Sequence, residues 1–225
     1  MNITKTHMIQ LIDNYKSQKK APFVVEILGT PNSGKTTAIQ TFEKLLKRNN
    51  VKCKIIYEAA GRCKIKNKFS PEFNLWTLNE TVKQLLEAYT ENYDIIVCER
   101  GLLDTLCWFN IYYQDNLINK KEYDIIVGYT LLKGLVNRID YELIVNCSVE
   151  TSLYRENLSD IIEAAGTIVN EVVLTKYNSS LEKVKNEYNR YFEKVVMIDT
   201  TELTQPEINK VFISKIFEFM KLTIE

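Results

Sequence analysis

The stretch FVVEILGTPNSGKTTAIQTF, residues 23–42, decides the fold of this chain. Its first six residues are apolar except for Glu26 and rich in β-branched side chains, which indicates a buried strand. Apolar residues then recur at helical spacing between residues 37 and 48, at Ile39, Phe42, Leu45 and Leu46. The sequence therefore predicts a strand, a loop that contains glycine and a helix, in that order.

The loop has the pattern G-x-x-x-x-G-K-[ST], in which Gly29 and Gly34 are the two fixed glycines. Glycines let the backbone turn tightly, and successive N–H groups at the start of the helix point at phosphate oxygens. Lys35 can neutralise the β- and γ-phosphates of a triphosphate, and Thr36 can ligate Mg²⁺. We predict that ATP and Mg²⁺ are bound by Gly29, Thr30, Pro31, Asn32, Ser33, Gly34, Lys35, Thr36 and Thr37.

Four further apolar runs indicate strands, at residues 53–57, 94–98, 141–147 and 194–198. Stretches with helical spacing separate them, at 71–91, 102–114, 120–138, 149–163, 170–191 and 206–221. This alternation predicts an α/β protein with a five-stranded parallel sheet and helices on both faces, the three-layer P-loop NTPase fold. Apolar residues of the first 20 positions predict a leading helix before the first strand.

Length and composition narrow the class of protein. The chain of 225 residues has no linker rich in glycine, serine or proline, so we expect one domain, 1–225. The 29 basic residues balance the 29 acidic ones, which gives no electrostatic support for a large nucleic-acid surface or an anionic membrane surface. The sequence has no signal-peptide pattern and no membrane-spanning run, and its five cysteines form no CxxC pair. We expect a cytoplasmic protein with reduced thiols and a small-molecule substrate.

In an open parallel sheet, ligands bind beyond the carboxyl ends of the strands, and two of the predicted strands end in a glutamate. After the third strand, Glu99 can hold Mg²⁺ and Arg100 can grip a phosphate or a substrate oxygen. After the second strand, Glu58 can accept a proton from an acceptor hydroxyl, and the basic residues that follow can hold an anion. Those basic residues are Arg62, Lys64, Lys66 and Lys68. A surface ion pair and a solvated charged loop are the plain alternatives.

Over most of residues 22–220 the chain resembles the nucleoside and nucleotide kinases of the P-loop class. Deoxynucleoside kinases carry a Glu at the end of strand two and Glu-Arg-Ser after strand three, while thymidylate kinases carry Arg-Glu-Pro-Gly-Gly and Asp-Arg-aromatic there. The matching positions in this sequence are Glu58, Gly61, Glu99 and Arg100. Ala59 replaces the proline of the thymidylate kinases, and Gly101 departs from both families at the third position of the second motif.

The resemblance implies further roles. In deoxynucleoside kinases an aromatic residue of the next helix stacks on the acceptor base, and Phe109 is the positional match, with Trp108 and Tyr112 four apart nearby. A lid that carries arginine follows strand four, which corresponds to approximately residues 148–170 here, where Arg155 is the one arginine. The resemblance also makes a homodimer plausible.

We therefore expect an ATP-dependent phosphotransferase that moves the γ-phosphoryl group to a small acceptor, a nucleoside or a nucleoside monophosphate. Lys35 would stabilise the transferred group, Thr36 and Glu99 would hold Mg²⁺, and Arg100 would orient the acceptor. Glu58 would act as the base or as an acceptor clamp, and Arg62 and Phe109 would bind the substrate. The basic residues after Glu58 favour an anionic acceptor, whereas Glu58 as a base favours a neutral hydroxyl.

Two other functions stay open at this point. A GTPase switch is suggested by Asn119-Lys120-Lys121-Glu122, close to Asn-Lys-x-Asp, and by Glu58-Ala59-Ala60-Gly61, close to Asp-x-x-Gly. Both stretches carry Glu where such proteins have Asp. The second alternative is a P-loop kinase whose acceptor is not a nucleoside, such as a sugar or a vitamin, which would differ only in the acceptor pocket.

Overall fold

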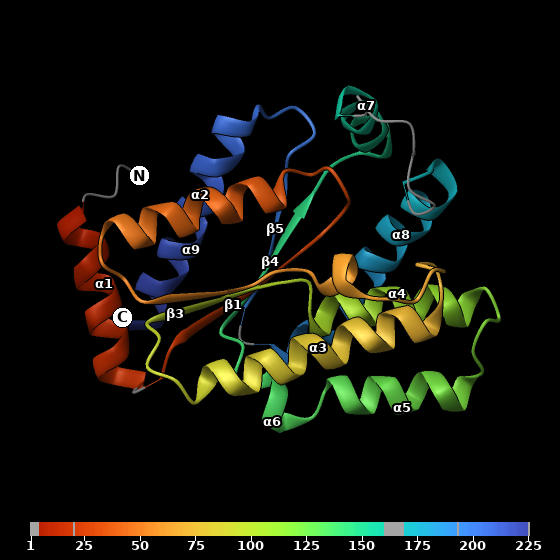
Figure 1. Cartoon of the computed structure of the whole chain (residues 1–225), viewed down its shortest axis with the longest axis horizontal. Helices are drawn as coiled ribbons and strands as arrows, with labels where there is room; N and C mark the ends of the chain where they lie inside the picture. Colours follow the sequence, from red (N-terminus) through yellow and green to blue (C-terminus); the bar gives the residue numbers. More distant parts are fainter. Residues whose placement is uncertain (1–4, 20, 160–168, 193, 225) are drawn as a thin grey trace.

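The computed structural model describes residues 5–19, 21–159, 169–192 and 194–224, and one parallel sheet runs through its centre (Figure 1). Its strands are β1 (Phe23–Leu28), β2 (Cys53–Ile56), β3 (Ile95–Glu99), β4 (Tyr141–Asn146) and β5 (Val195–Asp199). They lie in the order β2-β3-β1-β4-β5, and every neighbouring pair is parallel. The predicted five-stranded parallel sheet is confirmed, and the loop of residues 29–34 leaves its central strand.

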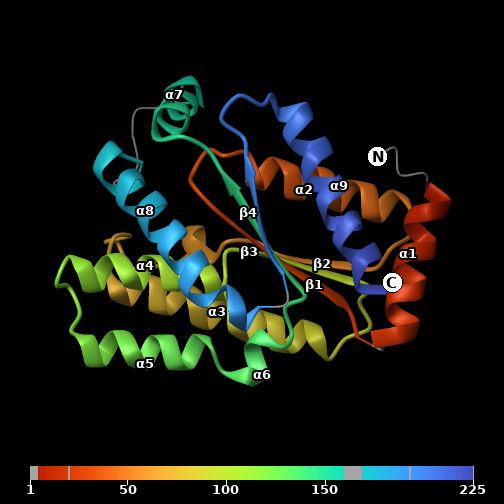
Figure 2. The ribbon, with the colours of Figure 1, turned by 180° about the vertical axis from the view of Figure 1, so that it is seen from behind.

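Helices cover both faces of the sheet, as Figures 1 and 2 show from opposite sides. One face carries α1 (Lys5–Lys19), α2 (Lys35–Arg48) and α9 (Gln205–Ile224). The other carries α3 (Pro71–Tyr89), α4 (Leu102–Gln114), α5 (Lys120–Thr130), α6 (Lys133–Val136) and α8 (Glu171–Tyr188). The short 3₁₀ turns η1 (Ala59–Arg62) and η2 (Asn189–Tyr191) follow β2 and α8. Among the described residues, no helix is long and apolar enough to span a membrane.

The position of β1 in the sheet explains why its sequence is an almost unbroken apolar run. Val24 and Leu28 pack into the core on the α3, α4 and α8 face, whereas Val25 and Ile27 pack into the core on the α1, α2 and α9 face. A central parallel strand is buried on both faces, so it shows no polar alternation. Glu26 is the exception, a fully buried carboxyl group in the middle of the strand.

Several helix starts follow from local sequence signals. Ser70 caps α3 by accepting a hydrogen bond from the N–H of Phe73, and Pro71 takes the first helical position. Asn119 and Glu122 form a reciprocal capping box at the start of α5. The stretch 119–122, which is close to the Asn-Lys-x-Asp motif of GTPases, therefore forms the start of a helix.

One predicted helix is wrong in its extent. The sequence predicted a continuous helix over 120–138, but the structure has α5 and α6 with a break at Leu131 and Leu132. Leu132 takes an extended ψ of 126°, and the break turns Leu135 and Val136 into the core before β4 begins. Apolar spacing continues across the break, so the pattern alone does not reveal it. The predicted helix over 149–163 appears as α7 (Val149–Ser159), and residues 160–163 lie outside the described part of the chain.

Gly29 is a position where the fold demands glycine. Its φ is +132°, and a Cβ atom there would lie 2.0 Å from the carbonyl oxygen of Val145. We predict that Gly29→Ala lowers the free energy of unfolding by at least about 1–3 kcal/mol, as overpacking typically does. Urea denaturation measures this loss.

Gly128 offers the matched control, because it is exposed in α5 and a Cβ there meets no atom within 4 Å. Gly128→Ala should raise stability by about 0.5–1 kcal/mol, the helix-propensity difference between the two residues. Equal effects of the two substitutions would contradict this account of the loop.

Candidate active site

The loop between β1 and α2 is shaped and held by its surroundings. Gly34 and Asn32 take positive φ angles of 89° and 57°, which turns the backbone tightly before α2. The Thr30 hydroxyl donates to Asn146 Oδ1 at 2.9 Å and accepts from the N–H of Cys147 at 3.0 Å. The loop is thereby tied to the end of β4, and the N–H groups at the start of α2 form a place for anions.

Lys35 is buried and lies against the loop itself. Its Nζ donates to the carbonyl oxygen of Thr30 at 2.5 Å and to Ser33 Oγ at 3.3 Å. Burial lowers the pKa of the Lys35 ammonium group to about 8, and the nearby Arg100 charge acts in the same direction. A bound polyphosphate would bring negative charge to this ammonium group and raise its pKa again.

A hydroxyl and a carboxylate meet beside the loop, since Thr36 Oγ1 donates a hydrogen bond to Glu99 Oε1. Thr36 starts α2 and Glu99 ends β3, which pairs directly with β1. These are hard oxygen donors of the kind Mg²⁺ takes, and Mg²⁺ usually keeps several waters and phosphate oxygens besides one or two protein ligands. The Thr36 hydroxyl and the Glu99 carboxylate could therefore serve as the protein ligands of such an ion.

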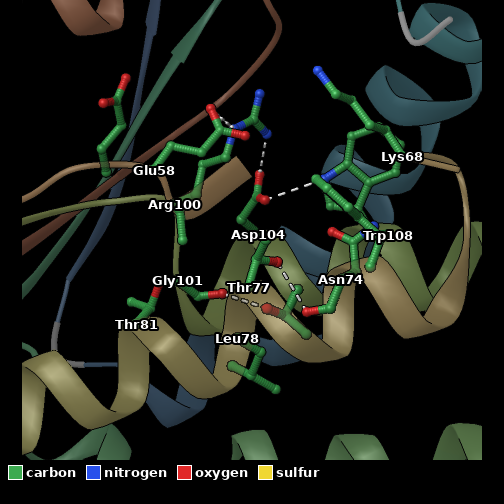
Figure 3. Close-up of a pocket in the computed structure, with 14 residues that line it drawn as sticks. Glu58, Lys68, Asn74, Thr77, Leu78, Thr81, Arg100, Gly101, Asp104 and Trp108 are labelled. Atoms are coloured by element: carbon green, nitrogen blue, oxygen red, sulfur yellow. Dashed lines mark hydrogen bonds and ion pairs between the residues drawn. The ribbon is translucent and has the colours of Figure 1, made fainter. Parts of the chain in front are cut away.

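A hollow opens next to Glu99, between α3 and α4 and the turn after β2 (Figure 3). The space between its lining atoms is about 510 Å³ with its open mouth included. The polar side chains that line it are Glu58, Lys68, Asn74, Thr77, Thr81, Glu99, Arg100, Asp104, Thr105 and Trp108. Phe73 and Leu78 add apolar surface.

Arg100 lies between two carboxylates in this hollow, as Figure 3 shows. Its Nε is 3.1 Å from Glu58 Oε2, and one terminal nitrogen is 3.0 Å from Asp104 Oδ1. Burial alone would lower the pKa of the guanidinium, but the charges of Asp104 and Glu58 raise its pKa well above the ordinary value. Arg100 also takes a φ of +61°, a conformation that non-glycine residues adopt mainly where surrounding contacts enforce it.

Asp104 is the anchor of this arrangement. Besides Arg100, it accepts hydrogen bonds from Trp108 Nε1 at 3.1 Å and from the Tyr177 hydroxyl at 2.5 Å. Tyr177 belongs to α8, so Asp104 connects the hollow to a third helix. Asp104 was not among the predicted site residues, although its spacing of four from Arg100, just before α4, and from Trp108 within α4 was the signal that could have found it.

The structure brings most of the predicted site residues together but not all of them. Lys35, Thr36, Glu58, Glu99 and Arg100 lie along one edge of the sheet. Phe109 does not line the hollow, because it is buried and packs edge-on against Tyr112 with ring centroids 5.5 Å apart. Trp108 lies in the wall instead.

Two predicted arginines have other surroundings. The Arg62 side chain is 59% exposed, and its nearest acidic partner is Glu80 at 3.9 Å, away from the hollow. Arg155 donates to the carbonyl oxygens of Asn32, Thr200 and Leu203, and so joins α7, the phosphate loop and the segment after β5. Residues 160–168 of the predicted lid, 148–170, lie outside the described part of the chain.

Solved structures of deoxyadenosine kinase from M. mycoides are similar to this chain. The structure with bound dATP gives a TM-score of 0.65 at 18% identity, covering 86% of this chain and 98% of that chain. The structure with the products dCMP and a flexible dCDP gives 0.63 at 18% identity, and the one with bound dCTP gives 0.61 at 16%, both with the same coverage. No protein-family model and no curated protein sequence matches the chain. The predicted P-loop NTPase fold is thus confirmed, in the form that this deoxyadenosine kinase has.

We predict that Asp104→Asn lowers the free energy of unfolding by at least about 1–3 kcal/mol, because three donors lose a charged acceptor. The exposed Asp124, whose ion pair with Lys120 lies on the surface of α5, provides the control. Asp124→Asn should change stability by less than about 1 kcal/mol. Chemical denaturation of both variants checks this, and equal small effects would mean that Asp104 is not an anchor.

The lowered pKa of Lys35 leads to a prediction about how ATP binding depends on pH. Because a triphosphate would raise that pKa, binding takes up a proton once the free protein has lost it, at pH values above about 8. The Kd for ATP should therefore be flat below about pH 7.5 and increase by up to about tenfold per pH unit above 8. Titration calorimetry at pH 7 and 9 measures this, and Lys35→Arg, which stays charged, should weaken the dependence.

Proposed function

We propose that this chain is an ATP-dependent kinase that transfers the γ-phosphoryl group to a hydroxyl of a nucleoside. One observation carries the proposal: the Glu99-Arg100 turn borders the phosphate loop through Thr36 and the hollow through Glu58. A triphosphate on the loop and an acceptor in the hollow would therefore meet at Glu99. The solved neighbours, whose titles name a deoxyadenosine kinase and its nucleotides, support this choice.

The residues have separate roles in this proposal. The loop N–H groups and Lys35 hold the β- and γ-phosphates, while Thr36 and Glu99 hold Mg²⁺, which when bound neutralises charge on the transferred group. Glu58 accepts the proton of the attacking hydroxyl, and Arg100 keeps Glu58 in place and faces the acceptor. Positioning and charge stabilisation supply the catalysis, as they do generally in phosphoryl transfer.

The charges of the hollow favour a neutral acceptor over a monophosphate. Three carboxylates line it, Glu58, Glu99 and Asp104, against the cations Arg100 and Lys68. Arg100 is already shared between two of those carboxylates, and Arg62, which pairs with Glu80, does not line the hollow. With Glu99 assigned to Mg²⁺ and Arg100 occupied by Glu58 and Asp104, Lys68 is the one cation among the lining residues left for a phosphomonoester, whereas a sugar hydroxyl would find a carboxylate acceptor in Glu58. We infer that the acceptor is a nucleoside.

The wall between α3 and α4 suits a nucleobase. Trp108 supplies an aromatic surface, and Asn74, Thr77 and Thr81 supply hydrogen-bonding groups along α3. Asn74 is held by the Tyr112 hydroxyl behind it. On the other side of the phosphate loop, Arg155 borders a second hollow with Tyr154, where we infer that the adenine of ATP lies.

We predict that Glu58→Gln lowers kcat by about 10²–10⁴-fold, the contribution typical of a general base, while ATP still binds. Release of ADP is measured with Mg²⁺, ATP and a panel of nucleosides, nucleoside monophosphates and sugars. Lys66→Gln, on the exposed loop that follows, is the control and should keep the parent's kcat.

The panel also separates the competing functions. Stimulation by nucleosides alone is expected, and stimulation by monophosphates alone would contradict the inferred neutral acceptor. Stimulation by sugars alone would favour a kinase with another acceptor. An acceptor-independent preference for GTP in thermal-shift assays would favour the switch, since a ligand that binds only the folded state raises its apparent stability.

A further inference from the structure

Glu26 in β1 is fully buried and makes contacts that neither the phosphate loop nor the hollow requires of it. Its carboxylate accepts hydrogen bonds from the N–H groups of Leu102 at 2.8 Å and Leu103 at 3.1 Å, with Asp104 N at 3.4 Å. These are the first N–H groups of α4, which have no partner within the helix. Gly101, the N-cap residue of α4, has no side chain to cap them. A carboxylate from another strand therefore caps this helix.

Gly101 and Glu26 fit together sterically. A Cβ atom at Gly101 would lie 2.6 Å from Glu26 Oε2 and 2.7 Å from Glu26 Cδ, so a side chain there and this carboxyl group exclude one another. The deoxynucleoside kinase motif Glu-Arg-Ser places a serine at this position, and a serine hydroxyl is a favoured helix cap. In this chain the cap is supplied by Glu26, which explains why the third motif position is glycine.

A second buried carboxyl group accompanies Glu26. Glu142 is its register partner on β4, is also fully buried, and neither of its oxygens accepts a hydrogen bond from a donor among the described residues. A buried carboxylate without donors next to another carboxylate is very costly, so we infer that Glu142 carries a proton, for which the neighbouring Glu26 carboxylate is the acceptor. Burial, with the charge of Glu26, raises the pKa of Glu142 well above its ordinary value.

Burial favours the protonated form of both carboxyl groups of the pair. Burial raises the pKa of Glu26 to about 7, although the N–H of Leu102 acts in the opposite direction. The other titratable groups that face the pair are Cys98 on β3 and Asp104 and Cys107 on α4. Glu26 is the member with N–H donors and lies at a helix N-terminus, where negative charge is favoured, so Glu26 is the one that ionises.

We propose that Glu26 is a positioning residue of the kinase site, which fixes the first turn of α4 and thereby the Asp104–Arg100 pair, while Glu142 supplies the proton that lets it stay charged. The first turn carries Asp104, whose carboxylate holds Arg100, and Arg100 holds Glu58. Loss of the cap would loosen this chain of contacts without touching the phosphate loop. The effect on the acceptor rests on the proposed function, whereas the capping itself does not.

The test compares Glu26→Gln with Glu142→Gln in the full chain. Glutamine at position 26 removes the charge and turns an NH₂ group toward N–H donors, so hydrogen exchange of the Leu102 and Leu103 amides should quicken about tenfold or more. The KM for the nucleoside should rise about tenfold with the KM for ATP unchanged. Glutamine at position 142 can still donate to Glu26, so exchange and both KM values should stay within about twofold of the parent at pH 7.5.

A further readout needs no activity. Because folding raises the pKa of both carboxyl groups above 4.5, the folded chain binds more protons than the unfolded one, and the parent should lose stability as the pH rises from about 4.5 through 7 and beyond. Glu142→Gln removes one titrating group and should flatten this loss. An unchanged pH profile of stability in Glu142→Gln would overturn the shared proton.

Gly101→Ala tests the same contact between residues 101 and 26 by changing its other partner, and it replaces Glu26→Gln if that variant does not fold. Its Cβ should displace the carboxylate and quicken exchange of the same two amides. In a Glu26→Ala background, where the clashing carboxyl group is gone, Gly101→Ala should lower the free energy of unfolding much less than it does in the parent.

Each outcome separates this proposal from the proposed function. Unchanged exchange in both variants would overturn the capping role, whatever the enzyme does. Faster exchange with an unchanged nucleoside KM would overturn the positioning role and leave the kinase proposal standing. Faster exchange in a chain that phosphorylates no acceptor would confirm the cap, contradict the proposed function and overturn the link of Glu26 to a kinase site.

Discussion

The pairing of β1 with β3 is the constraint on which the rest of the site depends. Ile27 lies opposite Glu99, and the N–H of Arg100 donates to the carbonyl oxygen of Ile27 at 2.8 Å. The phosphate loop and the Glu99-Arg100 turn therefore leave the sheet side by side, at the carboxyl ends of two neighbouring strands. A slip of one residue would turn every side chain of β1 to the opposite face and carry the Glu26 carboxylate away from the N–H groups of Leu102 and Leu103, so the register that places these two loops is fixed.

The charges at this edge are arranged so that each buried one has a partner. Arg100 lies between Glu58 and Asp104, Lys35 lies against carbonyl and hydroxyl oxygens, and Glu99 accepts from Thr36. Unpaired charges at such burial would be strongly unfavourable. These contacts are also ones that a triphosphate, Mg²⁺ and an acceptor hydroxyl would take over in the proposed reaction. Lys35, Glu58 and Glu99 are thus held in place through contacts that the ligands of the proposed reaction can replace.

Most of the fold was predictable from the sequence, because local patterns of apolar residues and a short motif determine it. The strands are apolar runs, and the Gly29–Thr36 pattern has a mechanical reason at each fixed position. The break between α5 and α6 was missed, since the apolar spacing continues through Leu131 and Leu132 and only the route of the chain to β4 requires a turn. Local periodicity does not contain that information.

The site was predictable where a residue follows a strand and less so where it lies on a helix face. The proximity of Glu58, Glu99 and Arg100 was predictable because the ends of parallel strands meet at one edge. Position in a motif selected Phe109, but the hollow is lined by Trp108, because a shift of one residue rotates a side chain by about 100° around a helix. Asp104 depends on Tyr177, which comes from a distant part of the chain, and no spacing in the sequence indicates that contact.

Gly101 shows how a departure from a motif can have its explanation elsewhere in the chain. Taken alone, a glycine where deoxynucleoside kinases have serine suggests a helix that has lost its cap and a site of uncertain kind. In the folded chain Glu26 occupies the space of the missing side chain and accepts from the N–H groups of Leu102 and Leu103. Glu142 lies beside Glu26 as its register partner on β4. One glycine, one capping carboxylate and one protonated carboxyl group therefore form a single unit, and substitutions at these three positions should be judged together.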